Sequence, residues 1–194
     1  MTSTDQDSPP DLNPLYEEAS GFYERDQMPA AAERFERVLA EDPGHMAARY
    51  KLGNVRKEQG RLDEASAHYR ALLARDPRHA EALNNLGALY QAQDIPDAAE
   101  TYYRQAMGYK PELAPPYVNL GRLLQGQGRH ADAVQIYRKA LERGLDAGLF
   151  GHLLAALTVE AGDQAARAPA AYVRETFDAF AAGFEDRVVG QLGY

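Results

Sequence analysis

Residues 82–111 read ALNNLGALYQAQDIPDAAETYYRQAMGYKP, and this stretch decides the fold. Its landmarks return every 34 residues along the chain. Prolines, small residues, alanines and aromatic residues all keep this step: Pro43, Pro77, Pro111; Ala19, Gly53, Gly87, Gly121; Ala31, Ala65, Ala99, Ala133; Phe35, Tyr69, Tyr103, Tyr137. A period of this length is typical of solenoids, in which each unit buries its apolar face only against its neighbours.

Within each copy the pattern predicts two amphipathic helices. Turns are expected near Gly60, Asp94 and Gly128, where glycine suits a left-handed residue after a helix. The second helix is expected to end at pairs such as Asp42-Pro43, since proline disfavours helical geometry at the residue before it. The chain also holds 34 alanines but only 15 Val, Ile and Thr residues. Composition and period together predict an all-α, right-handed α-solenoid of helix-turn-helix repeats.

The same landmarks predict the domain organisation. We expect a disordered tail at residues 1–11 and a solenoid at residues 12–162, with repeats at 12–45, 46–79, 80–113 and 114–147. A half repeat at 148–162 would follow, with Gly162 at the turn position. Residues 163–194 would form a linker and an amphipathic helix.

The pattern L-G-x-x-Y/V followed by A-x-x-x-Y-x-x-A-x-x-x-x-P resembles the tetratricopeptide repeat (TPR). Copy one is the weakest match, with Ala19 for glycine and Leu15 for the usual tryptophan. The resemblance implies that the first helices line a concave groove that binds a protein or an extended peptide. By phase the groove residues are Tyr50, Lys51, Asn54, Asn84, Asn85, Ala88, Gln91, Val118, Asn119, Arg122 and Gln125.

Amides dominate this set, and Asn85 and Asn119 share one phase. A side-chain amide both donates to and accepts from a peptide backbone, so an amide ladder would hold an extended segment. The alternative is that these amides are a solvated helix face. The family's clamp for a C-terminal carboxylate is poorly supported, because Tyr50, Asn84 and Val118 stand where lysine is wanted.

Other functions lack the residues that they need. A net charge of −8 argues against nucleic acid and anionic partners. The absence of cysteine excludes thiol chemistry and favours a reducing compartment. No apolar run could span a membrane and no secretory signal is visible, so the expected location is the cytoplasm. The five histidines fall at scattered phases, so no metal site is predicted. Gly126-Gln127-Gly128 has no strand before it and is predicted to be a turn rather than a phosphate loop.

Aromatic residues recur at helical spacing near the C-terminus, at Tyr172, Phe177, Phe180 and Phe184. One interpretation is a capping helix over the last unit; another is self-association through this helix. The stretch APAAYVRETFDAFAAGFEDRVVGQLGY also resembles the linker between TPRs and a class I S-adenosylmethionine-dependent methyltransferase domain. That resemblance implies a recognition arm of such an enzyme, against the alternative of a free-standing adaptor. Because the sequence ends at Tyr194, we expect no catalytic residue and no cofactor site within it.

Overall fold

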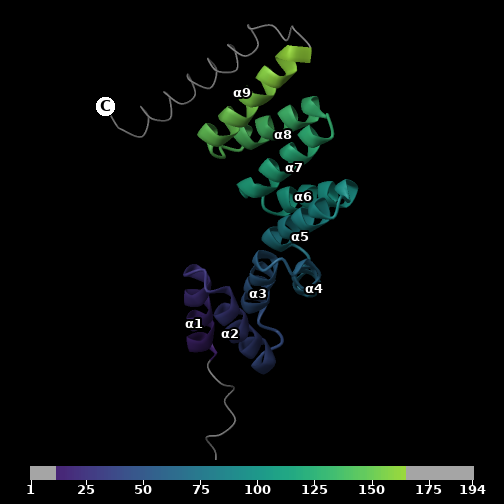
Figure 1. Cartoon of the computed structure of the whole chain (residues 1–194). Helices are drawn as coiled ribbons and strands as arrows, with labels where there is room; N and C mark the ends of the chain where they lie inside the picture. The colour runs from purple at the N-terminus through teal and green to yellow at the C-terminus, as the bar shows by residue number, and fades with distance from the viewer. Residues whose placement is uncertain (1–11, 165–194) are drawn as a thin grey trace, which may run out of the picture.

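The structure is a computed structural model that describes residues 12–164, with side chains described through residue 157. This part of the chain contains nine α-helices, which stack from α1 to α9 as Figure 1 shows. Their bounds are α1 Asn13–Glu24, α2 Met28–Glu41, α3 Met46–Glu58, α4 Leu62–Leu73, α5 Ala80–Ala92, α6 Pro96–Tyr109, α7 Ala114–Gly126, α8 His130–Glu142 and α9 Ala147–Gln164.

Each helix packs on the helix that follows it, so the helices form four pairs and a ninth helix. The closest pairings are α1 with α2, α3 with α4, α5 with α6 and α7 with α8, the two helices of one repeat. Contacts across a repeat boundary, such as α2 with α3, join neighbouring pairs. The predicted all-α solenoid is confirmed, since each pair meets only its neighbours in the sequence.

The turns between paired helices occur where the sequence predicts them. Gly60 and Gly128 have φ values of 73° and 74°, the left-handed conformation that glycine adopts without a Cβ clash. The same turns in the first and third pairs use Asp26 and Asp94, at 59° and 58°. Aspartate is among the few non-glycine residues that tolerate this conformation, because its short side chain bonds locally. Proline at the start of a helix then helps to set where α2 and α6 begin.

The small residue of each repeat lies directly against an aromatic ring of its partner helix. A Cβ added to Gly53 would come within 2.7 Å of Tyr69 Cε1, and one added to Gly87 would come equally near Tyr103 Cε1. Gly121 and Tyr137 make the same contact on α7 and α8. These rings are buried and form the centre of the core together with leucines of the first helices. The small residues therefore let the two helices of one repeat pack closely.

The last described helix differs from its expected length. We expected a turn at Gly162, but α9 continues through this residue to Gln164. A single glycine costs a helix only about 1 kcal/mol relative to alanine, so it does not by itself end one. The predictions for residues 1–11 and 165–194 lie outside the described residues. Within residues 12–164, no helix combines the length and apolar character that crossing a membrane requires.

Candidate functional site: the inner face of the first helices

The first helices lie closer to one another than the second helices do. α1 contacts α3 and α5 contacts α7, whereas successive second helices in the described chain do not pack this closely. Side-chain hydrogen bonds also join α3 to α5 and α5 to α7. A stack curves toward the side where its elements are closer, so the first helices form the inner face.

The structure places all eleven predicted groove residues on three first helices, but not all of them at the surface. Tyr50, Lys51 and Asn54 lie on α3; Asn84, Asn85, Ala88 and Gln91 on α5; and Val118, Asn119, Arg122 and Gln125 on α7. Gln91 and Arg122 are exposed, and most of the others are half-buried. Asn84 is the exception to the outward orientation that we expected, because it is 8% exposed and accepts a bond from α7.

A closed hydrogen-bond network lies where α3 meets α5. The hydroxyl of Tyr69 donates to Asn54 Oδ1 at 2.7 Å, and Asn85 Nδ2 donates to the same oxygen at 2.9 Å. Asn85 Nδ2 also lies 3.4 Å from the Tyr50 hydroxyl. Burial raises the pKa of the Tyr69 hydroxyl, which therefore stays protonated and able to donate. These amides serve first to connect adjacent repeats.

Asn119 repeats this connection one unit further along. Its Nδ2 atom donates to Asn84 Oδ1 at 3.0 Å, which ties α7 to α5. The predicted peptide ladder consists of Asn85 and Asn119. Each of these side chains donates one of its amide hydrogens to an asparagine of the preceding first helix. Their contact with a ligand stays a prediction.

Two glutamines differ from these asparagines, because their hydrogen bonds leave the NH₂ group available. Tyr103 donates to Gln91 Oε1 at 2.8 Å and Tyr137 donates to Gln125 Oε1 at 3.0 Å. Burial raises the pKa of Tyr103 to about 12 and also raises that of Tyr137, so both hydroxyls remain donors. Each amide oxygen is therefore occupied, while the Nε2 group donates to no protein atom in the described residues.

The charge on this face changes along the stack. Lys51 Nζ lies 4.8 Å from the centre of the Tyr23 ring, so this cation is held by an aromatic face. Glu81 accepts a hydrogen bond from Lys110 Nζ at 2.6 Å; although partial burial opposes it, this contact lowers the pKa of Glu81. Arg122 on α7 forms no ion pair within the described residues. The α5–α7 part therefore presents amide donors and one unpaired cation.

Two histidines in equivalent positions of adjacent repeats help to shape this face. His45 and His79 are 34 residues apart, so these two share a phase, contrary to the scatter described above. Each caps the next first helix, with Nδ1 accepting from the backbone N–H of Ala48 or Ala82. Their rings lie 5.1 Å from those of Tyr16 and Tyr50, respectively. The shared spacing was a signal that could have found them.

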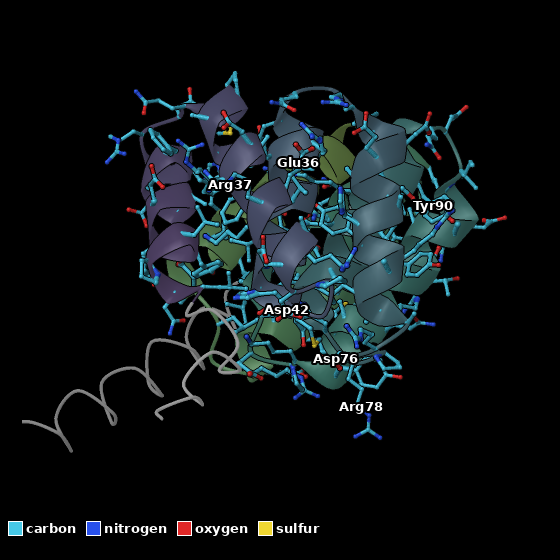
Figure 2. The ribbon with its side chains drawn as sticks, turned by 90° about the horizontal axis from the view of Figure 1, so that it is seen from below. Glu36, Arg37, Asp42, Asp76, Arg78 and Tyr90 are labelled. Atoms are coloured by element: carbon cyan, nitrogen blue, oxygen red, sulfur yellow. The ribbon has the colours of Figure 1, made fainter. Side chains whose placement is uncertain are left out.

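The loops before these caps repeat a second contact. Asp42 Oδ1 accepts from the Gly44 N–H at 2.7 Å, and Asp76 Oδ1 accepts from the Arg78 N–H at 3.1 Å. Figure 2 shows Asp42 and Asp76 along the same edge of the stack, with Arg78 projecting outward from it. The Asp-Pro-x-His sequence thus forms a compact junction between repeats.

Ion pairs tie repeats together away from the inner face. Arg56 is 5% exposed and pairs with Glu36, labelled in Figure 2, and with Glu64. Glu100 on α6 accepts from Arg104 on its own helix and from Arg129 Nη1 at 2.7 Å in the next repeat. The Arg129 guanidinium is the main cause that holds the pKa of Glu100 below its ordinary value. These contacts join helices of the stack rather than form a reactive site.

Within the described residues, no three side chains of the His, Cys, Asp and Glu types gather as a metal site would require. Gly126-Gln127-Gly128 forms the predicted end of α7 and turn into α8. The inner face can therefore donate and accept hydrogen bonds and offer aromatic surface, which is the chemistry of recognition.

Paired helices at a constant 34-residue step, stacked with the first helix inside, define a helical-repeat scaffold. Family models described as tetratricopeptide repeat match residues 22–90, and residues 79–108 and 117–144. Together these ranges cover more than half of the chain, which belongs to the tetratricopeptide repeat family. No curated protein matches the chain.

Solved structures share this fold. PilF of Pseudomonas aeruginosa has a TM-score of 0.70 at 24% identity, covering 89% of this chain and 76% of its own. TTC0263, a TPR protein of Thermus thermophilus, has a TM-score of 0.64 at 22% identity, covering 78% and 83%. MamA (41-end) from Desulfovibrio magneticus RS-1 has a TM-score of 0.62 at 24% identity, covering 68% and 75%. At this identity the likeness establishes the fold.

Proposed function

We propose that this TPR scaffold holds an extended segment of another protein along its inner face, chiefly over α5 and α7. The observation that carries the proposal is the pair of tyrosine-held glutamines. Because Tyr103 and Tyr137 occupy the amide oxygens, the NH₂ groups of Gln91 and Gln125 are left to donate. Backbone carbonyls of an extended segment are suitable acceptors for a row of such donors.

The arrangement also favours a bound segment over bound solvent alone. The two glutamines occur at the same phase in adjacent repeats, so their donors repeat with the spacing of the first helices. Their side chains are pinned before any partner arrives, which lowers the ordering cost of binding. Arg122 lies on α7 between Asn119 and Gln125. It adds a cation that pairs with no carboxylate in the described part.

Glutamate substitution tests the donors without releasing the tyrosines. In Gln91→Glu and Gln125→Glu, a carboxylate oxygen still accepts from Tyr103 or Tyr137, but the outward NH₂ donor is gone. Gln135→Glu is the matched control, since Gln135 is exposed on the second helix α8. The probe is an array of random peptides of about 15 residues, long enough when extended to span two repeats. Binding of the full chain, as wild type and as each variant, to the peptides of the array is measured. The unfolding midpoint of each protein is measured in parallel.

We expect the double variant to lose about tenfold or more in affinity for the peptides that wild type selects, as each lost hydrogen bond contributes about 1 kcal/mol. Its folding should be unchanged, and the Gln135→Glu variant should bind normally. Equal binding by the double variant and the control would contradict a role for these glutamines.

We also propose a finer assignment, in which the scaffold serves as the recognition region of an S-adenosylmethionine-dependent methyltransferase. Its support is the sequence pattern of residues 172–194, which lies outside the described residues. The test is the coding sequence beyond the codon for Tyr194. A strand followed by a glycine-rich turn within a few tens of codons would support the assignment, and an immediate stop codon in the native gene would remove it in favour of a free-standing adaptor.

A further inference from the structure

The inner face is locally positive at α7, although the chain as a whole is acidic. Arg122 is the single charged residue of α7, which contains no aspartate or glutamate. The first helices of the adjacent repeats add little negative charge. α5 has one carboxylate, Glu81, which accepts from Lys110 at 2.6 Å, and residues 147–157 of α9 have none. The net charge of −8, which by itself argues against anionic partners, therefore lies outside this part of the inner face.

Arg122 also differs from the other lysines and arginines of the described first helices, all of which lie on α3. Each of those has a partner: Arg49 a backbone carbonyl, Lys51 an aromatic ring, and Arg56 and Lys57 carboxylates. Arg122 is exposed and forms no ion pair with any described residue. Its charge is therefore available to a partner.

The guanidinium of Arg122 lies beside one of the two glutamine donors. Arg122 and Gln125 are three residues apart on α7, so their side chains are neighbours on one helix face. Burial raises the pKa of the Tyr137 hydroxyl, and the nearby positive charge of Arg122 opposes this rise. The same hydroxyl donates to Gln125 Oε1 at 3.0 Å. The guanidinium and the NH₂ group of Gln125 thus form a set of adjacent donors.

Neighbouring repeats leave this set of donors uncovered. The residues in phase with Arg122 on the adjacent first helices are Ala88 on α5, which is half-buried, and Ala156 on α9, which is exposed. Both side chains are too short to cover the guanidinium. Because the stack of first helices continues on both sides of α7, an extended segment passes over Arg122 and presents a side chain to it rather than its terminus.

A carboxylate is the group that fits these donors. A guanidinium only donates and a carboxylate only accepts, and the two can form a pair of parallel hydrogen bonds. We propose that Arg122 selects segments with an internal aspartate or glutamate, whose carboxylate pairs with the guanidinium beside Gln125. This inference rests on the proposed function, since it requires a segment that extends along α5 and α7.

Isosteric peptide pairs test the inference. Each peptide that wild type selects from the array is also made with its internal acids replaced by the corresponding amides, and again with an amidated C-terminus. Affinities are measured for the full chain as wild type, as Arg122→Gln and as Arg37→Gln. Arg37, labelled in Figure 2, is an exposed arginine of the second helix α2, so its variant is the matched control for the lost charge.

We expect wild type and Arg37→Gln to bind the acidic peptides about fivefold more tightly than their amide versions, as for a well-formed but partly hydrated ion pair. Arg122→Gln should bind both versions alike. Arg122→Glu should bind a version with lysine in place of the acid more tightly than wild type does. Because Arg122 is exposed, the unfolding midpoint should be unchanged in both of its variants.

An acid preference that is the same in Arg122→Gln and wild type would overturn the inference, as would binding that is lost on C-terminal amidation but not on internal substitution. Peptides that depend on Gln91 and Gln125 without preferring an acid would overturn it and leave the proposed function intact. An acid preference that requires Arg122, with unchanged binding by the double glutamine variant, would support it and contradict the role of the glutamines. An array without any bound peptide would overturn both.

Discussion

Substituting Gly87 with alanine tests the ring-on-glycine packing that organises each repeat. The new Cβ would lie 2.7 Å from Tyr103 Cε1, 2.8 Å from Tyr103 Cδ1 and 3.2 Å from the backbone oxygen of Ala99. Tyr103 is 1% exposed and its hydroxyl is bonded to Gln91, so the ring has little room to retreat. The backbone oxygen belongs to α6 and moves only if that helix moves. The substitution therefore overpacks the α5–α6 contact.

Two opposing effects set the magnitude. Overpacking a close-packed core costs about 1–3 kcal/mol. Replacing glycine by alanine inside a helix gains about 1 kcal/mol. Gly108 on α6 isolates the second effect, because nothing lies within 4 Å of a Cβ added there. We expect Gly108→Ala to be more stable than wild type by about 1 kcal/mol, and Gly87→Ala to be less stable than Gly108→Ala by about 1–3 kcal/mol.

The assay is urea unfolding of the full chain followed by circular dichroism. A third variant, Gly87→Ala with Tyr103→Phe, should recover part of the loss, because it recreates the pairing of Ala19 with Phe35. Equal stabilisation by Gly87→Ala and Gly108→Ala would refute the claim that the ring position excludes a Cβ.

Further predictions concern contacts between repeats. His79→Ala should lower the free energy of unfolding by about 1 kcal/mol through loss of the α5 N-cap. His79→Asn should lower it much less, because asparagine also caps a helix N-terminus. An equal loss of stability in both variants would contradict the capping role. Glu100→Gln should lower the urea midpoint at neutral pH. Arg129 chiefly depresses the pKa of Glu100, so the stabilisation that the Glu100 carboxylate contributes is present above pH 4.5 and is lost as the pH falls below that value. The difference in urea midpoint between Glu100→Gln and wild type should therefore close at low pH. Arg56→Leu should leave stability unchanged or raise it by about 1 kcal/mol, because its two carboxylate partners are exposed enough to be hydrated. A loss above about 3 kcal/mol in the same assay would contradict this.

The repeat period predicts the helices and their turns well because it reports backbone requirements. Gly60 and Gly128 stand where a left-handed residue is needed, and their structure follows from local sterics. The prediction fails at Gly162, where the period places a turn but α9 continues. A turn at this position forms when a second helix packs back on the first, and repeat phase alone does not reveal whether that helix is present.

The candidate site was predictable only at the level of the face. Phase places Asn84 and Asn85 on a first helix, but it does not distinguish a buried amide from one that faces a partner. That distinction depends on the packing of α7 over Asn84 and on which atom of the Gln91 amide accepts the hydrogen bond from Tyr103. Such pairings are decided by side-chain rotamers and interhelical distances, which one sequence does not specify.

The Asp-Pro-x-His junction makes the length of this protein adjustable in whole units. Excising residues 46–79 would join His45 directly to Ala80, so the same imidazole would face the N–H of Ala82 and start α5 as it now starts α3. Splicing in a further 34 residues, the length of one repeat, at the same point would regenerate the junction twice. The span of a grasped segment could thus be lengthened or shortened by gene duplication or deletion in fixed steps, with new side-chain complementarity needed only across a single boundary.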